Sequence, residues 1–222
     1  MNSIVQFILS LSISLTVIIG VIKFKTIDRS YYPFFYLAAV SLLVEILYFI
    51  LSQYKMYDAA GVMMNIFIMI EFGCFTWLFH EWGLFNFNKK IFSLIMTLVF
   101  AAWVFFVVIF IGITKTNFYF SLLYASILVV FAVTAFNKLV ITDRGNIFLN
   151  PKFWILIGVM IFYSFYILRY SAHLSVFGQN ASLTLKKGIY SIVSYANLFV
   201  NLIFAIAALC IPSKNRNFSK LF

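Results

Sequence analysis

Seven apolar stretches, each about as long as a membrane-spanning helix, dominate this sequence and leave little chain between them. A helix needs roughly 20 apolar residues to cross the hydrocarbon core of a bilayer. Hydrophobic residues make up 64% of the chain and charged residues 10%, whereas soluble domains have roughly 45 to 50% and about 25%. An ordinary soluble fold is therefore excluded. We predict an all-α polytopic membrane protein that forms a single transmembrane domain over residues 1–222.

The boundaries of the spans follow from where the apolar stretches stop. No proline interrupts a stretch: Pro33 and Pro151 stand near helix starts, where a missing N–H costs little, and Pro212 follows the last stretch. The first stretch has no small-residue cleavage site, so we expect it to remain as a helix. The predicted helices cover about residues 3–21, 31–52, 59–79, 91–113, 118–137, 153–168 and 188–211, with a basic tail at 212–222.

The distribution of basic residues predicts the orientation of the chain. Eleven Lys and Arg residues fall on the side of the connections that includes the C-terminus, and five fall on the other side. Because positive residues are retained in the cytoplasm, we expect the N-terminus outside and the C-terminus in the cytoplasm. The net charge of +10 is then explained by topology and by contacts with lipid headgroups. The bilayer is the expected partner, and nucleic acid is not.

Polar residues within the stretches indicate which helix faces look inward. Residues spaced four, three and four positions apart share one face of a helix. Such stripes occur twice, as Ser41, Glu45, Tyr48 and Ser52 in the second predicted helix and as Tyr190, Ser194, Asn197 and Asn201 in the seventh. Each stripe is an obvious partner for the other or for Glu71 of the third predicted helix.

The third and sixth predicted helices add further polar groups. Asn65 and Glu71 lie on the third, about 120 degrees apart around the helix at roughly 100 degrees per residue. The sixth carries Tyr163 and Tyr166 on one face, with Arg169 at its outer end. We predict an outward-opening cavity walled by the second, third, sixth and seventh helices. The fourth stretch has no charge within 91–113 and is expected to face lipid.

The two intramembrane carboxyls, Glu45 and Glu71, are the main candidates for function, because a charged side chain at bilayer depth is costly. They are expected to bind a ligand or a proton, together with the candidates named above: Asn65, Asn197, Asn201, Tyr48, Tyr163, Tyr166, Arg169 and Tyr190. The alternative is that both acids are protonated and hold the helices in register. No catalytic residue, metal site or cofactor is assigned.

Several strings resemble a family of uncharacterised seven-helix membrane proteins of Bacteroidota-type bacteria. They are Ser41-Leu-Leu-Val-Glu45-Ile, Asn65-Ile-Phe-Ile-Met-Ile-Glu71-Phe72, Asn150-Pro-Lys-Phe-Trp-Ile-Leu-Ile-Gly158 and the closing Asn197 to Cys210 segment. Members of this family are often encoded beside sensor histidine kinases or fused to them. The resemblance implies a bacterial inner-membrane location, a separate signalling kinase or other cytoplasmic effector as partner, and an emphasis on Glu45, Glu71, Asn65, Trp154 and Asn197.

These observations support three hypotheses about function. The first is a non-enzymatic sensor or receptor-like module in which binding at the acids shifts the packing of the helices. The second is a small transporter or channel that uses the same acids to couple protons or cations. The third, which has less support, is a lipid-modifying enzyme with the carboxylates as general acid and base.

Overall fold

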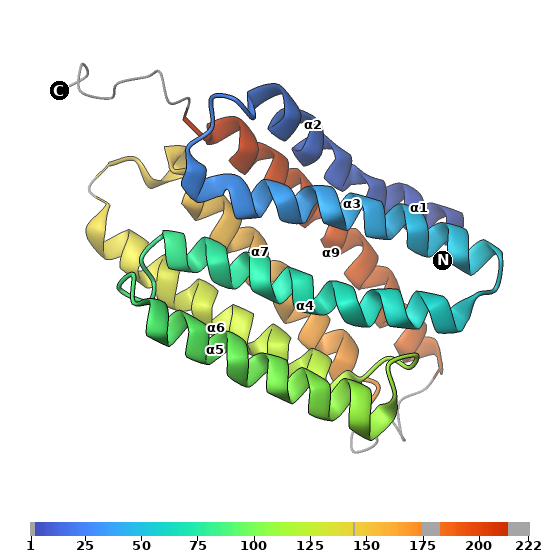
Figure 1. Cartoon of the computed structure of the whole chain (residues 1–222). Coiled ribbons are helices and arrows are strands. Elements are labelled where there is room, and N and C mark those ends of the chain that lie inside the picture. Colours follow the sequence, from blue (N-terminus) through green and yellow to red (C-terminus); the bar gives the residue numbers. More distant parts are fainter. Residues whose placement is uncertain (1–2, 144, 175–182, 213–222) are drawn as a thin grey trace.

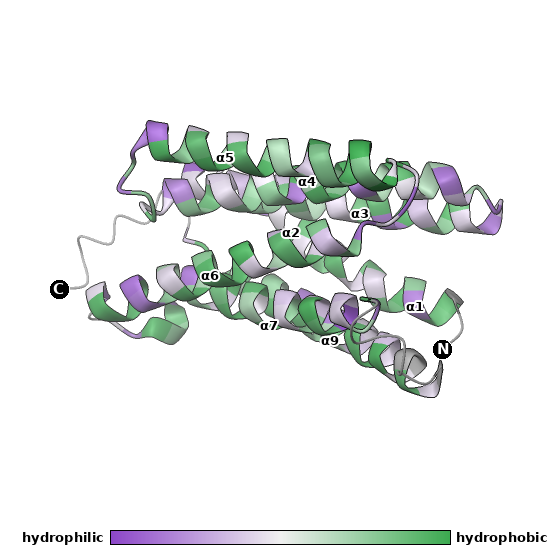
Figure 2. Ribbon diagram, turned by 90° about the horizontal axis from the view of Figure 1, so that it is seen from below, coloured by the Kyte–Doolittle hydropathy of each residue, from purple (hydrophilic) through white to green (hydrophobic). Residues whose placement is uncertain are grey.

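Seven long helical segments lie side by side in one bundle (Figure 1). The computed structural model describes residues 3–143, 145–174 and 183–212. Within these ranges seven segments are long and apolar enough to cross a membrane, which confirms the predicted all-α class and number of candidate spans. Figure 2 shows hydrophobic residues along the helices and hydrophilic ones gathered mainly near their ends. The predicted basic tail lies outside the described residues from position 213 onward.

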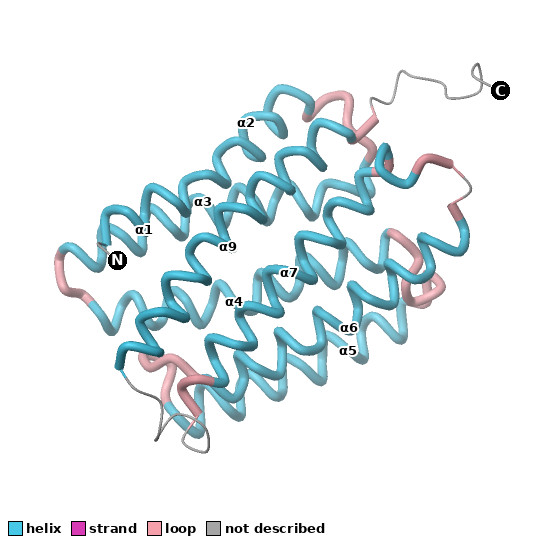
Figure 3. The backbone as a smooth tube through the Cα atoms, turned by 180° about the vertical axis from the view of Figure 1, so that it is seen from behind, coloured by secondary structure: helices cyan, strands magenta, loops and turns pink. Residues whose placement is uncertain are grey.

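The elements follow the predicted stretches closely, and helices and loops make up the described chain (Figure 3). The first span consists of α1 (Ser3–Ser10), a 3-10 turn (Leu11–Ile13) and α2 (Ser14–Lys23). The others are α3 (Tyr32–Gln53), α4 (Tyr57–Glu81), α5 (Lys89–Trp103) continued by a π-helix (Val104–Ile111), α6 (Phe118–Thr142), α7 (Pro151–Ser171) and α9 (Leu183–Cys210).

Two kinds of difference separate these elements from the prediction. Helices α4, α6 and α7 extend beyond the predicted ends, because hydropathy marks where apolar residues stop and the backbone stays helical further. The first and fourth spans are not uniform α-helices, since they contain the 3-10 turn and the π-helix. Neither irregular segment contains a proline, which is a residue that reveals a helix kink in a sequence.

The order of packing places the first and last spans next to each other. Helix α9 packs against α7 on one side and against α1 and α2 on the other, and α3 packs on α4. The segment from Lys89 to Ile111 is the least buried of the seven candidate spans, in agreement with the prediction that it faces lipid.

Asparagine side chains cap the N-termini of three of the helices. The side-chain oxygens of Asn88, Asn117 and Asn150 accept backbone N–H groups of the first turns of α5, α6 and α7 at 2.9 to 3.0 Å. Each bond satisfies a donor that the helix itself leaves unpaired. These helices can therefore begin directly after short connections.

A lysine ends α9. The Lys23 ammonium, at the end of α2, donates to the carbonyls of Leu209 at 2.6 Å and Ala208 at 3.2 Å. Those carbonyls have no partner within α9, and the negative end of the helix dipole favours a cation there. The sequence suggested only a topological role for Lys23, and the structure adds a bond between the first and last spans.

Asn65 fixes the turn between the π-helix and α6. Its side-chain amide donates to the carbonyls of Ile113 at 2.6 Å and Lys115 at 3.0 Å. One turn earlier in α4, Gly61 lies so close to the Thr114 carbonyl that a Cβ atom would overlap it. Asn117 in the same turn donates to the Phe106 carbonyl of the π-helix. These contacts hold the turn on α4.

We predict that Asn65→Ala lowers the thermal unfolding temperature of the detergent-purified protein. The change removes both bonds to the carbonyls of the turn and costs about 1 to 3 kcal/mol. Asn137→Ala is the matched control, because Asn137 is exposed on α6 and no hydrogen bond of its side chain is recorded. Equal unfolding temperatures for the two variants would contradict this role of Asn65.

Candidate functional site

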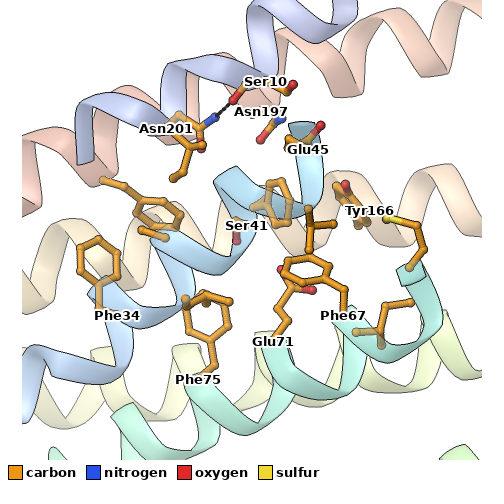
Figure 4. Close-up of a pocket in the computed structure, with 18 of the residues that line it drawn as sticks. Ser10, Phe34, Ser41, Glu45, Phe67, Glu71, Phe75, Tyr166, Asn197 and Asn201 are labelled. Atoms are coloured by element: carbon orange, nitrogen blue, oxygen red, sulfur yellow. Dashed lines mark hydrogen bonds between the residues drawn. The ribbon is translucent and has the colours of Figure 1, made fainter. Parts of the chain in front are cut away.

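A cavity of about 90 Å³ lies inside the bundle and contains both candidate acids. Its lining comes from α1, α3, α4, α6, α7 and α9, together with the 3-10 turn (Figure 4). The predicted wall of four helices was therefore incomplete, because the first and fifth spans also contribute. At roughly 15 Å³ for each water, the volume admits about six waters or a small polar molecule.

The carboxyl of Glu71 lies next to two tyrosine hydroxyls. Its side chain is buried at 8% exposure, and the Tyr124 hydroxyl of α6 donates to its Oε2 atom at 3.2 Å. The Tyr163 hydroxyl also lies near this carboxyl, but it makes no hydrogen bond of normal geometry to a described residue. The rings of Tyr124 and Tyr163 meet edge to face at 5.8 Å. No lysine or arginine of the described chain forms an ion pair with Glu71.

Glu45 lies on α3 near the break in the first span. The Ser10 side chain is its neighbour across the helix interface, and Arg169 is the nearest basic group. Ser10 also donates its hydroxyl proton to the Phe7 carbonyl at 2.9 Å. Figure 4 shows Glu45 beside Ser10 and Asn197, and Glu71 on the opposite wall. The two acids therefore face one cavity from two adjacent helices.

The side-chain amide of Asn201 is hydrogen-bonded at the 3-10 turn that breaks the first span. Its amide donates to the Ser12 hydroxyl at 2.9 Å and approaches the Ser10 carbonyl at 3.5 Å. In the 3-10 turn the Ser14 N–H bonds to the Leu11 carbonyl, three residues back, in place of the Ser10 carbonyl that an α-helix would use. Asn201 thus ties α9 to the irregular turn of the first span.

Asn197 lies one turn away from Asn201, and its side-chain amide is not used in this way. Within the described chain its amide has no recorded hydrogen bond, and the same holds for the hydroxyls of Ser41 and Tyr166. All three residues line the cavity. Polar groups inside proteins normally have partners, so these groups are available to water or to a bound molecule.

The half of the cavity toward the C-terminal end of α9 is aromatic. Phe34 and Phe75 lie there with Phe204, and the rings of Phe34 and Phe204 meet edge to face at 5.4 Å. Gly158 of α7 permits this packing, because a Cβ atom there would overlap the Phe204 ring. The cavity therefore has a polar half and an apolar floor.

Arg169 and Tyr190 contact each other outside the lining of the cavity, and Arg169 acts on the Glu45 carboxyl through its charge. The guanidinium stands over the Tyr190 ring at 4.6 Å and over the Tyr166 ring at 5.7 Å. The Tyr190 hydroxyl hydrogen-bonds His173 Nε2 at 2.8 Å, and the His173 ring stacks on Phe118 at 4.8 Å. This cluster joins α7 to α9, and its place at an outer rim of the cavity stays a prediction.

Five of the predicted residues are not among those that line the cavity, and Arg169 and Tyr190, described above, are two of them. Asn65 is engaged by the turn that follows the π-helix. Tyr48 is exposed on the outside of α3, because the stripe is wider than the face that the cavity occupies. Tyr163 is fully buried behind the cavity and contacts Glu71 from there.

Sequence reasoning missed Tyr124, Ser10 and Ser12. Tyr124 and Ser121 lie one turn apart in the fifth span, and Ser10, Ser12 and Ser14 alternate in an otherwise apolar first span. Those serines were the available signal for a helix break. Among the described residues no three His, Cys, Asp or Glu side chains gather in a way that would hold a metal.

Comparison with known proteins found no family model, no curated protein and no solved structure that matches this chain. The resemblance to the kinase-associated family stays a prediction. What the protein does has to be inferred from its own cavity and charges.

We predict that Tyr124→Phe destabilises the protein by about 1 to 3 kcal/mol, because it leaves the buried Glu71 carboxyl without its hydrogen-bond donor. Tyr119→Phe removes the same hydroxyl from the exposed face of the same helix and is the control. Thermal unfolding in detergent measures both. If the two variants unfold together, the bond from Tyr124 to Glu71 does not support the fold.

Proposed function

We propose that this chain is a bacterial inner-membrane protein with its N-terminus outside and its C-terminus in the cytoplasm, and that it acts as a non-enzymatic sensor of a small ligand. Seven candidate spans and the excess of basic residues on one side support this location and orientation. With an odd number of spans the two termini lie on opposite sides. The end that holds Arg169 and Tyr190 then faces outward.

The observation that carries the proposal is the shared cavity. Glu45 of α3 and Glu71 of α4 line it together with the unpartnered amide of Asn197. Its walls come from six of the seven spans, so a ligand that contacts both acids touches most of the bundle at once. Such a ligand favours one packing of the helices over another, which is the requirement for a signal.

The chemistry of the lining favours a small organic cation. Arg169 lies near Glu45, whereas Glu71 has phenols and no basic partner around it. Aromatic rings such as Phe67 and Phe75 surround the acids. A carboxylate with aromatic walls is the combination that binds ammonium groups, because the rings attract a cation that is removed from water.

Transport is the second candidate, because Glu71 lies near the middle of its span, where coupling acids of transporters lie. The aromatic floor of Phe34, Phe75 and Phe204 brings no polar side chain to that part of the cavity. An apolar floor suits a receptor better than a channel for ions. Under the sensor proposal the altered packing is passed to a separate kinase or other cytoplasmic effector.

We predict that choline, used as a probe, raises the unfolding temperature of the detergent-purified protein in a saturable manner. At 100 times the dissociation constant a ligand stabilises by about 2.7 kcal/mol. Glu71→Gln should abolish the shift. The exposed Glu81 of the same helix provides the control Glu81→Gln, which should keep it.

Two results would contradict the sensor proposal. No shift by choline in the folded wild-type protein would reject the organic-cation site. Saturable choline uptake into proteoliposomes that is lost in Glu71→Gln would instead establish transport.

A further inference from the structure

A second pocket, of about 80 Å³, lies at the cytoplasmic end of the proposed topology. It is formed where the turn after α4 meets α6 and α7. Two lysines line it, Lys138 from α6 and Lys152 from α7, together with Trp82 and Thr142. Three leucines and Ala135 complete the lining, so the lysines are the charged groups that the described residues bring to it.

The two ammonium groups keep most of their donors free. Lys138 Nζ donates to the Gly83 carbonyl at 2.7 Å. Lys152 Nζ stands over the Trp82 ring at 5.5 Å and has no recorded hydrogen bond or ion pair with a described residue. Each ammonium has three N–H donors. The pocket thus offers two adjacent cations with unfilled hydrogen-bonding capacity.

The nearby carboxylates are bonded elsewhere. Asp143 accepts from the Asn150 amide at 2.7 Å and from the Gly145 N–H at 2.9 Å, and these bonds hold the pKa of its carboxyl below the usual range. Asp28 accepts from the Ser30 N–H at 2.8 Å. Both acids attract Lys152 from a distance. They leave the space between the two lysines without an anion of the described chain.

The surroundings of the pocket are apolar and exposed. Ile141 at the end of α6 is 82% exposed, and Phe148 and Leu149 in the connection to α7 are 60% and 71% exposed. The Trp154 indole donates to the Phe148 carbonyl at 2.8 Å and holds this connection in place. Apolar side chains at this end are suited to the boundary between headgroups and acyl chains.

We propose that the pocket between Lys138 and Lys152 binds an anionic phosphate group, with its source in the headgroup of an anionic phospholipid. Paired lysines between helices at the cytoplasmic surface recognise such headgroups through charge. The exposed Ile141, Phe148 and Leu149 would contact the acyl chains. A soluble phosphate compound shares the chemistry of the group but has no use for these apolar residues.

The test is native mass spectrometry of the full chain in detergent with added phosphatidylglycerol. The wild-type protein should retain phosphatidylglycerol in preference to phosphatidylcholine, whose positive choline group opposes the lysines. Lys152→Gln should weaken retention about fivefold, the value expected for one lysine at a charged surface. Lys152→Arg should preserve it, and the exposed Lys90 supplies the control Lys90→Gln, which should leave it unchanged.

Lys138→Gln provides a second variant and should show a similar loss, with thermal unfolding used to confirm that it is folded. Inorganic phosphate forms the other arm: displacement of phosphatidylglycerol by millimolar phosphate would support the phosphate site and assign it to a soluble source. Equal retention of phosphatidylglycerol by wild type and Lys152→Gln, or equal retention of phosphatidylcholine by wild type, would overturn the proposal.

Discussion

Side-chain hydrogen bonds at helix breaks, turns and helix ends join the helices of this bundle. An apolar chain has few polar side chains, and an unsatisfied polar group in hydrocarbon is costly. Here Asn201 bonds at the 3-10 turn, Asn65 and Asn117 bond around the π-helix, and Lys23 bonds at the end of α9. Once these groups are assigned, the polar side chains that are left over mark the places where another molecule can bind.

The helical elements were predictable because each apolar stretch is one span, and the inward faces were predictable from spacing. Glu45, Asn197 and Asn201 do line one cavity with Glu71. The breaks in the first and fourth spans were not predictable from hydropathy, since hydropathy is the same for α, 3-10 and π backbone, and only the alternating serines of the first span signalled one of them. For that reason Asn65 and Asn197 look equivalent in the sequence, although one is bonded to a turn and the other is free.

The two pockets differ in the charge of the molecule that they fit. The central cavity brings carboxyls to aromatic walls, and the second pocket brings ammonium groups to an apolar surface. Helices α6 and α7 take part in both, and the turn after α4 lines the second pocket. Under the proposed function and orientation, a change in the packing of α6 and α7 at the cavity would reach the lysines.

The most direct test of the central claim is the accessibility of the cavity from outside. In a background with Cys74→Ala and Cys210→Ala, Asn197→Cys places a thiol in the cavity, and Phe199→Cys places one on the outer face of the same helix. A membrane-impermeant cationic thiol reagent added to intact cells should label Asn197→Cys and leave Phe199→Cys unlabelled. Labelling of neither, or labelling of Asn197→Cys only after the cells are opened, would contradict an outward-facing polar cavity.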